Sequence, residues 1–447
     1  MLELLAPAGN LDAVIAAVQN GADAVYMGFG DGFNARRSAD NFTRESFAKA
    51  VRYCHIRGCK VYVTLNTLVG DREMDAAAAL AQQASDAGAD AILVQDLGLA
   101  RVLRAALPDI PLHASTQMSI HNLAGVEAAA EMGITRAVLA RELSLEQIRF
   151  ISQHASIETE VFVHGALCFC YSGQCYMSAL IGRRSGNRGA CAQPCRMQYS
   201  MGGRMDEYPL SLRDNCLADY LQQLEDAGVA CVKIEGRMKN PDYVFNVVRV
   251  WRRALDMLCD GAWDPGAVEE LERELGRSFN RGFTDAYLRG RSGGELMSFE
   301  RAINQGVRVG RLVAVGHEEV TVELDAAVAA GDTLEIRFYP GADARPDVPK
   351  RWPQVPCPVD AAAGKRVVVH CKRKVDAGCE VYLIRSAGVL GHVEQPGVSD
   401  RSGTPADAGR NDGTASRKEI PARLCGGCLG NGVSGQQDRT GKAAGRL

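Results

Sequence analysis

The sequence lacks any apolar run that approaches the roughly 20 residues of a membrane-spanning helix. Its start, MLELLAPAGN, is briefly apolar but has neither the basic segment nor the apolar core of a signal peptide. Strong positive charge is also missing, because the net charge is −3, so the composition is not that of a protein that coats nucleic acid. These absences predict a cytoplasmic protein with no membrane partner. They do not exclude a local basic patch, which a site-specific RNA enzyme needs.

Cysteine, by contrast, is plentiful, with 15 residues among 447. In a reducing compartment, clustered thiols serve more often as metal ligands or catalytic groups than as disulfides. Five of them, at positions 168, 170, 175, 191 and 195, fall within HGALCFCYSGQCYMSALIGRRSGNRGACAQPCR, residues 164–196. This polar, glycine-containing segment is therefore the first candidate for a functional site.

A repeated pattern in the first half predicts strands that alternate with helices. NGADAVYMGF (20–29), AGADAILVQD (87–96), MGITRAVLAR (132–141) and AGVACVKIEG (227–236) each place a glycine at a helix end before a short apolar run. Such runs fit strands buried on both faces, and further strands are expected at 3–6, 60–66, 110–113 and 157–163. Eight units predict an α/β fold, a TIM-like (β/α)8 barrel over residues 1–242. A doubly wound open sheet is the alternative.

Polar residues follow most of these predicted strands. They occur in TLNT (64–67), VQD (94–96), HASTQ (113–117), ARE (140–142), VHG (163–165) and KIEGR (233–237). In such barrels, catalytic residues sit where the strands end and the loops begin. These strand ends therefore predict a functional rim.

The second half changes character. Residues 243–300 are expected to form a helical extension, because VFNVVRVWRRALDML is strongly amphipathic. Residues 301–393 alternate apolar and polar side chains between glycine turns, which predicts a small antiparallel β-barrel domain. Residues 394–447 contain no aromatic side chain and are rich in Gly, Ser, Asp, Arg and Pro, so a disordered tail is expected. The CGGC at 425–428 resembles half of a metal site without a second pair nearby.

Four of the clustered cysteines have the spacing C-x6-C-x15-C-x3-C, namely Cys168, Cys175, Cys191 and Cys195. Thiolates are soft anionic ligands that suit iron–sulfur clusters and zinc. Glycines at 173, 186 and 189 would let the backbone wrap closely around a bulky inorganic core. Structural zinc favours C-x2–4-C pairs, and only the last two cysteines fit. The spacing favours a 4Fe–4S cluster, with zinc or no metal as alternatives.

A cysteine nucleophile is a further alternative. His164 and Cys168 stand four residues apart, and a Cys–His pair can be catalytic. Such a site also needs an orienting group and an oxyanion site. The HExxH motif of zinc proteases does not occur in the sequence.

The run EVFVHGALCFCYSGQCYMS (160–178) resembles the signature of the collagenase-like peptidases, the unassigned peptidase family U32. The matching residues are Glu160, Phe162, Gly165, Ala166, Cys168, Gly173, Cys175 and Ser178. The resemblance covers roughly residues 1–290 and includes LLAPAGN, GADAVYMG, HASTQ, LARELS, GNRGACAQPCR and KIEGRMK.

This resemblance implies chemistry other than proteolysis. Family members that resemble this chain hydroxylate ribosomal RNA, the wobble uridine of transfer RNA, or ubiquinone without oxygen, and four cysteines bind an iron–sulfur cluster in them. The implied ligands here are Cys168, Cys175, Cys191 and Cys195, whereas Cys170 and Cys231 are not among them. VTLNT, HASTQ and YSGQCY favour the branch that hydroxylates cytidine in ribosomal RNA, whose members have a longer C-terminal part. Dependence on prephenate as a co-substrate is also implied.

We therefore expect an enzyme that hydroxylates cytidine in ribosomal RNA, with hydroxylation of the wobble uridine of transfer RNA as the alternative. A peptidase and a non-catalytic RNA-binding module are further alternatives. Arginines beside the cysteines would hold RNA phosphates, namely Arg183, Arg184, Arg188 and Arg196. An arginine pair in the pocket would grip a dicarboxylate such as prephenate. Candidate catalytic groups are Glu142, His164 and Glu235, with either glutamate as acid or base and structural salt bridges as the alternative. The other expected pocket residues are Arg36, His113, Gln117, Arg141 and Arg237.

Overall fold

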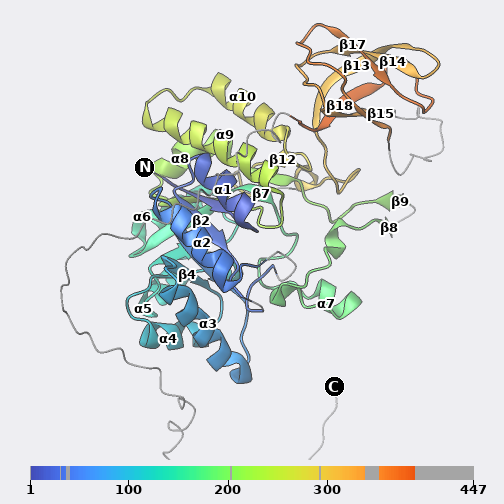
Figure 1. Cartoon of the computed structure of the whole chain (residues 1–447). Helices are drawn as coiled ribbons and strands as arrows, with labels where there is room; N and C mark the ends of the chain where they lie inside the picture. Colours follow the sequence, from blue (N-terminus) through green and yellow to red (C-terminus); the bar gives the residue numbers. More distant parts are fainter. Residues whose placement is uncertain are drawn as a thin grey trace, which may run out of the picture. The chain divides into compact units, whose positions relative to one another are not determined.

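The computed structural model describes residues 2–30, 32–36, 41–201, 204–290, 293–337 and 352–387 (Figure 1). Eight parallel strands close into a barrel, because β11 pairs with β1 on one side and with β7 on the other. This closure confirms the TIM-like barrel and decides against the open sheet. The strands are β1 (Glu3–Pro7), β2 (Ala24–Met27), β3 (Lys60–Leu65), β4 (Ala91–Val94), β5 (Leu112–Ala114), β6 (Arg136–Val138), β7 (Glu158–Ala166) and β11 (Cys231–Ile234).

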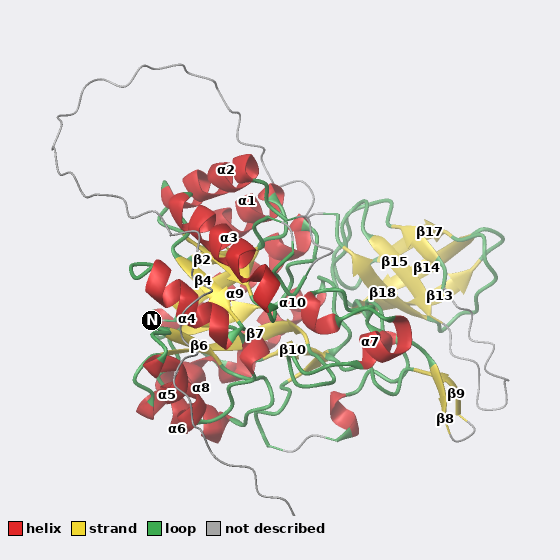
Figure 2. Cartoon of the chain, turned by 90° about the horizontal axis from the view of Figure 1, so that it is seen from below, coloured by secondary structure: helices red, strands yellow, loops and turns green. Residues whose placement is uncertain are grey.

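Helices surround the barrel strands, as Figure 2 shows in red around yellow. Several begin at polar caps: the side chains of Asn10, Thr43 and Asp96 each accept a hydrogen bond from the backbone N–H three residues later. The helices that connect the strands are α1 (Leu11–Gln19), α2 (Arg44–His55), α3 (Met74–Asp86), α4 (Leu97–Ala106), α5 (Leu123–Glu131), α6 (Leu145–His154) and α8 (Leu221–Asp226).

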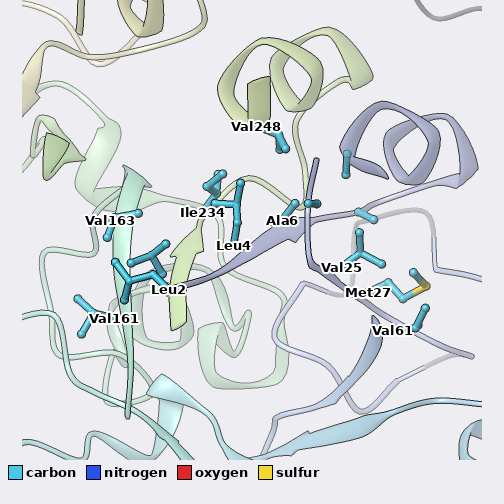
Figure 3. Packing of buried hydrophobic residues seen from close by; sticks show 14 of the residues in the cluster. Leu2, Leu4, Ala6, Val25, Met27, Val61, Val161, Val163, Ile234 and Val248 are labelled. Atoms are coloured by element: carbon cyan, nitrogen blue, oxygen red, sulfur yellow. The ribbon is translucent and has the colours of Figure 1, made fainter. Parts of the chain in front are cut away.

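The main core lies between the strands and the helices. Alternate strand residues point outward into it, and Figure 3 shows Leu4, Ala6 and Val25 on this side, with Val248 of helix α9 (Pro241–Cys259). The residues between them, such as Leu5 and Tyr26, form a separate cluster inside the barrel. Because α9 packs on β1 and α1, the division expected at residue 242 does not separate this helix from the barrel.

The expected helical extension is only partly helical. It contains α9 and α10 (Pro265–Gly276), after which β12 (Phe283–Thr284) pairs with β10 (Asp214–Cys216). Strand β10 pairs antiparallel with the last residues of β7 and is an additional strand outside the ring of eight. Both strands are too short to give an apolar run in the sequence. The segment between β7 and β10 also holds α7 (Met177–Gly182) and the hairpin of β8 (Tyr199–Met201) and β9 (Arg204–Glu207).

The expected small β domain is present as an antiparallel six-stranded sheet with order β16-β15-β18-β13-β14-β17. Its end strands β16 and β17 lie close together, so the sheet is a nearly closed barrel around its own apolar core. The strands are β13 (Val307–Val315), β14 (Glu319–Leu324), β15 (Thr333–Arg337), β16 (Gln354–Pro356), β17 (Arg366–His370) and β18 (Glu380–Arg385). The expected tail at 394–447, with its CGGC, lies outside the described residues. Among the described helices, none combines the length and hydropathy needed to cross a membrane.

Candidate active site

A pocket of about 390 Å³ lies at the end of the barrel where the parallel strands finish. Its walls come from β2, β3, β4, β7 and β11 and from the loops that follow β2, β3, β5 and β11. Four of the expected pocket residues meet here, namely Arg36, Gln117, Glu235 and Arg237. The remaining lining residues are Tyr26, Ala35, Thr64, Asn66, Leu93, Ser115, Thr116, Phe162 and Lys233.

Glu235 is held by cations in this pocket. Nη2 of Arg36 lies 3.2 Å from its Oε1. Burial by itself raises the pKa of Glu235, but the positive charges of Arg36, Arg141 and Arg237 outweigh burial and lower this pKa below its usual value. The carboxylate in turn raises the pKa of Arg36. Glu235 is therefore ionised, which suits a proton acceptor or counter-ion and not a general acid.

Arg237 is almost completely buried beside this pair. It donates hydrogen bonds to Oγ1 of Thr64 and, over 2.7 Å, to Oδ1 of Asn34. Burial lowers its pKa to about 10. Arg237 and Thr116 both line the pocket, and neither Nε of Arg237 nor the hydroxyl of Thr116 has a hydrogen-bond partner among the described residues. A buried polar atom without a partner costs about 1–3 kcal/mol, so these two atoms indicate a polar ligand.

The cysteine segment, residues 167–196, follows β7 and lies beside this pocket. Interaction with the Cys168 thiol contributes to the raised pKa of Arg36, so this thiol and the pocket arginine are neighbours. Burial raises the pKa of Cys195, and the charges of Cys168, Cys191 and Cys175 raise it further. The four thiols predicted as ligands thus lie within electrostatic reach of one another. As they stand, no three His, Cys, Asp or Glu side chains of the described ranges are close enough to hold a single metal ion.

Backbone contacts hold this segment against the pocket. A Cβ on Gly173 would collide with the carbonyl oxygen of Gln117, and φ of +80° at this position also favours glycine. Ser119 Oγ donates to the carbonyl oxygen of Ser172 over 2.7 Å. Arg141 donates to Oγ of Ser172 over 2.6 Å and to the carbonyl oxygen of Ala166 over 2.9 Å. Arg141, expected to bind substrate, therefore positions the segment and lines an adjacent hollow.

The four arginines expected to hold RNA phosphates divide into two pairs. Arg196 donates to the carbonyl oxygens of Leu167 and Leu212, so its guanidinium fastens the segment. Arg188 forms two hydrogen bonds to Glu73, of 2.7 and 2.8 Å. Arg183 and Arg184 are exposed to solvent, and only Nε of Arg184 donates to a backbone oxygen. Arg188 and Arg196 thus bind groups of the protein itself, whereas Arg183 and Arg184 lie at the surface.

Three expected pocket residues lie elsewhere. His113 points into the barrel interior against the Tyr62 ring, 5.0 Å away, and burial lowers its pKa to about 3. Glu142 is not among the lining residues, although burial raises its pKa and its Oε2 lacks a partner among the described residues. His164 is buried against Trp251 and Phe283, with ring centroids 6.1 and 5.6 Å away.

The outward position of His164 has a local cause. Phe162 pairs with Lys233 and His164 with Ile234, so Val163 is an extra residue in β7. Such a β-bulge changes the face on which the following side chain lies. By strict alternation with Phe162, His164 would point into the barrel. Burial instead lowers its pKa to about 3, and the structure gives it a packing position in place of the expected catalytic one.

The sequence profile of peptidase family U32 matches residues 9–298, which include seven of the eight barrel strands and the cysteine segment. The chain belongs to peptidase family U32. The resemblance expected from the motif around Cys168 is thereby confirmed. In this U32 protein the matched region supplies every residue of the pocket described above.

Named relatives of this U32 chain include both RNA-modifying proteins and a collagenase. It is 39% identical over 347 residues to the 23S rRNA 5-hydroxycytidine C2501 synthase of Escherichia coli, covering 75% of this chain and 52% of that protein. The chain thus spans about half the length of this relative. It is 36% identical to the collagenase of Porphyromonas gingivalis, covering 66% of this chain and 75% of that one. It is also 36% identical to the tRNA hydroxylation protein P1 of Bacillus subtilis, covering 66% and 73%.

Lys233 is a charged pocket residue of the U32 protein that was not predicted from the sequence. Lys233 is buried at the pocket, with its Nζ 2.8 Å from Oε1 of Glu160 and 4.4 Å from the centre of the Tyr26 ring. A signal was present, because alternation in CVKIEG places Lys233 on the same face as Cys231 and Glu235. A lysine inside an apolar run is easily taken for a strand end, since an unpaired charge is costly to bury.

Proposed function

We propose that this protein is an iron–sulfur-dependent hydroxylase of RNA bases, with cytidine in ribosomal RNA as its substrate. The observation that carries the proposal is the position of the four thiols: Cys168 neighbours Arg36 of the pocket, and Cys168, Cys175 and Cys191 all neighbour Cys195. A redox centre and a ligand pocket would thus adjoin at the functional end of the barrel. The 39% identity to a ribosomal RNA hydroxycytidine synthase supports the choice of base.

The donor set suits a polynuclear iron–sulfur centre. Cys168, Cys175, Cys191 and Cys195 would hold it, and when bound a 4Fe–4S cluster supplies one-electron transfer. The backbone N–H of Gln193 lies 3.3 Å from Sγ of Cys191, and Oγ of Ser178 lies 3.7 Å from the same sulfur. Such donors stabilise a thiolate and tune a sulfur ligand. Zinc is the alternative occupant of the same four thiols.

The pocket would bind the oxygen-donating co-substrate. Converting a C–H bond of a base into C–OH is a two-electron oxidation. We propose that a co-substrate with a C–OH group donates the oxygen: its C–O bond breaks, a C–H bond replaces it, and the co-substrate thereby accepts the two electrons. We propose a dicarboxylate of the prephenate class, since Arg36, Arg237 and Lys233 present positive charge to one cavity. Glu235 would keep Arg36 oriented, and the free Nε of Arg237 would donate to the ligand.

Transfer RNA is the second candidate substrate. The 36% identity to a tRNA hydroxylation protein favours it, and the proposed pocket chemistry would serve a wobble uridine equally. Analysis of both RNA classes separates the two substrates.

The collagenase-like alternative is favoured only by the likeness to one relative. The Cys–His pair that it would use is not supported, because His164 is packed against aromatic rings on the outer side of β7. Residues 290–294 have the spacing G-x-S-x-G, but Ser292 lies outside the described residues. A turn over Ala286–Arg289 precedes this motif, whereas a nucleophile elbow follows a strand directly.

The test combines metal analysis with nucleoside analysis. Protein purified without oxygen should contain iron and sulfide, and Cys191→Ser should lose both. Cys259→Ser is the matched control, because Cys259 is an exposed cysteine of α9 outside the cysteine segment. In a strain without the gene, mass spectrometry of digested ribosomal RNA should show loss of 5-hydroxycytidine, restored by the wild type and Cys259→Ser but not by Cys191→Ser.

Other outcomes are equally clear. Zinc in place of iron, or iron retained by Cys191→Ser, contradicts the cluster assignment. Loss of hydroxyuridine from transfer RNA, with ribosomal RNA unchanged, replaces the first substrate by the second. If both RNAs keep all hydroxylated nucleosides, the RNA hydroxylase proposal is wrong.

A further inference from the structure

Exposed apolar side chains are concentrated around the cysteines. Among the described residues, 16 large hydrophobic side chains are exposed, and six of them fall between residues 169 and 197. Three of these six are aromatic: Phe169, Tyr171 and Tyr176 are 45%, 61% and 62% exposed. The others are Leu180, Ile181 and Met197. Scattered exposed hydrophobic residues are normal, whereas a concentration next to a functional site indicates a binding surface.

The charge of the same stretch points to a polyanion. Between Glu160 and Asp206 the sequence contains no acidic residue, although 23% of the chain is charged. Two of its arginines, Arg183 and Arg184, are exposed directly after the apolar residues of α7. A protein partner would usually be met by charges of both signs at the rim of an interface. Exposed aromatic rings in a stretch whose charged side chains are all arginines suit a ligand with aromatic faces and phosphates.

Tyr171 is held close to the pocket by its neighbours in the chain. Tyr171 precedes the buried Ser172, which Arg141 and Ser119 fasten, and Gly173, which lies against Gln117 of the pocket lining. The backbone N–H of Gln174 donates to the carbonyl oxygen of Tyr171 over 3.1 Å and closes the turn. The backbone next to the exposed ring is therefore fixed. If one base stacks on Tyr171, the adjacent nucleotide of the RNA strand would lie beside the pocket.

We propose that Phe169, Tyr171 and Tyr176 form a stacking platform for unpaired RNA bases at the entrance of the pocket. The inference rests on the proposed function and adds that the substrate is recognised as an unstacked, single-stranded segment. Stacking on aromatic side chains is how proteins recognise splayed-out bases, because every base offers a π face. Enzymes that act on a base atom also need that base out of its stack. Arg183 and Arg184 would contact the phosphates on either side.

The direct test is binding of a fluorescein-labelled 12-nucleotide single-stranded RNA, measured by anisotropy with the full-length, iron-loaded protein. Replacing Phe169, Tyr171 and Tyr176 together by Leu removes the π faces and keeps apolar side chains. We expect affinity to fall by about tenfold or more, because stacking contributes about 1–3 kcal/mol per base. The salt dependence should stay as in the wild type, since the arginines remain. Phe150→Leu, at a ring that is 54% exposed on α6, should bind normally.

A second variant guards against damage to the cluster, because Phe169 and Tyr176 adjoin proposed ligands. Tyr171→Leu alone should weaken binding with unchanged iron content, and Tyr171→Phe should restore it. The wild type should also prefer the single strand over the same sequence paired with its complement. Unchanged affinity in the triple variant, or preference for the duplex, overturns the platform and leaves the patch as a protein-docking surface.

The nucleoside assay separates the two proposals. If the triple variant restores 5-hydroxycytidine to wild-type levels in the deletion strain and binds single strands normally, the platform is wrong and the hydroxylase proposal stands. If the deletion strain keeps all hydroxylated nucleosides, the hydroxylase proposal fails, and the binding measurement still decides on the platform.

Discussion

At the scale of single residues, burial changes what an ionisable side chain can do. His113 and His164 both have a pKa of about 3, chiefly because burial disfavours the imidazolium ion. Neither is therefore a proton shuttle near neutral pH. Glu235 is partly buried, and surrounding arginines keep it charged. Ionisable residues of strand-end motifs can thus be packing groups or charged pocket groups, depending on their neighbours.

The buried His164 makes folding depend on pH. The unfolded chain binds a proton on this residue near its ordinary pKa of 6.5, whereas the folded protein binds it only near 3. The unfolded state therefore holds more protons below pH 6.5, and stability is complete above this pH and falls as the pH drops toward 3. Between pH 7.5 and 5.0, His164 should account for a loss of about 2 kcal/mol.

We expect His164→Phe to remove this part of the pH dependence. The free energy of unfolding, measured with urea at pH 7.5 and 5.0, should fall by about 2 kcal/mol less in the variant than in the wild type. Any constant packing cost of the larger ring cancels in this difference. His154→Phe, at an exposed histidine of α6, is the control. Equal pH dependence in His164→Phe and the wild type would contradict the burial argument.

At the scale of elements, the cysteine segment is an irregular stretch held by side chains of its neighbours. Arg141 after β6 donates to the hydroxyl of Ser172, and Arg196 donates to the carbonyl oxygen of Leu167. Arg188 ties the segment to Glu73 before α3. These contacts replace the backbone hydrogen bonds that a helix or strand would supply. They leave Arg183 and Arg184 as the basic side chains that point to solvent.

This division predicts different roles for the arginines in RNA binding. A double Arg183→Ala, Arg184→Ala variant should weaken single-strand binding and reduce the slope of log affinity against log salt by about 1.4, since each lost phosphate contact removes about 0.7. Arg188→Ala should keep the wild-type slope, because its guanidinium already binds Glu73, and lower stability by less than about 1 kcal/mol. Titration of the labelled single strand at several salt concentrations measures both slopes. Equal slopes for the two variants would refute the assignment.

At the scale of the whole molecule, ion pairs inside the barrel join strands that are distant in sequence. Lys233 of β11 meets Glu160 of β7 over 2.8 Å, where the two strands close the barrel. Arg136 of β6 lies 3.6 Å from Glu160 and 2.6 Å from Glu3 of β1. The charges on the interior face are thus paired with one another across the barrel. Removing one partner of such a buried pair lowers the stability of the folded protein, because the other charge is left buried without compensation.

A double-mutant cycle tests the closing pair. Lys233→Met should lower the free energy of unfolding by about 3–5 kcal/mol, because it leaves Glu160 buried without its nearest cation. Adding Glu160→Leu should recover a large part of this loss, since no buried charge is then stranded. Urea unfolding of the four proteins gives the coupling energy. If the double variant loses as much free energy of unfolding as the two single variants lose together, the ion pair does not stabilise the closed barrel.

The sequence by itself determined the eight strands, the small β domain and the family, because glycine-ended helices, buried apolar runs and clustered cysteines are local patterns. The sequence also predicted the pocket residues Arg36, Gln117, Glu235 and Arg237, since the loops after parallel strands meet at one end of the barrel. Only the tertiary structure decided that His164 turns outward, that Lys233 faces the pocket and that Arg188 and Arg196 bind the protein itself. The physical reason is that one extra residue in a strand reverses the face of a side chain, and a charge's partner comes from a distant strand.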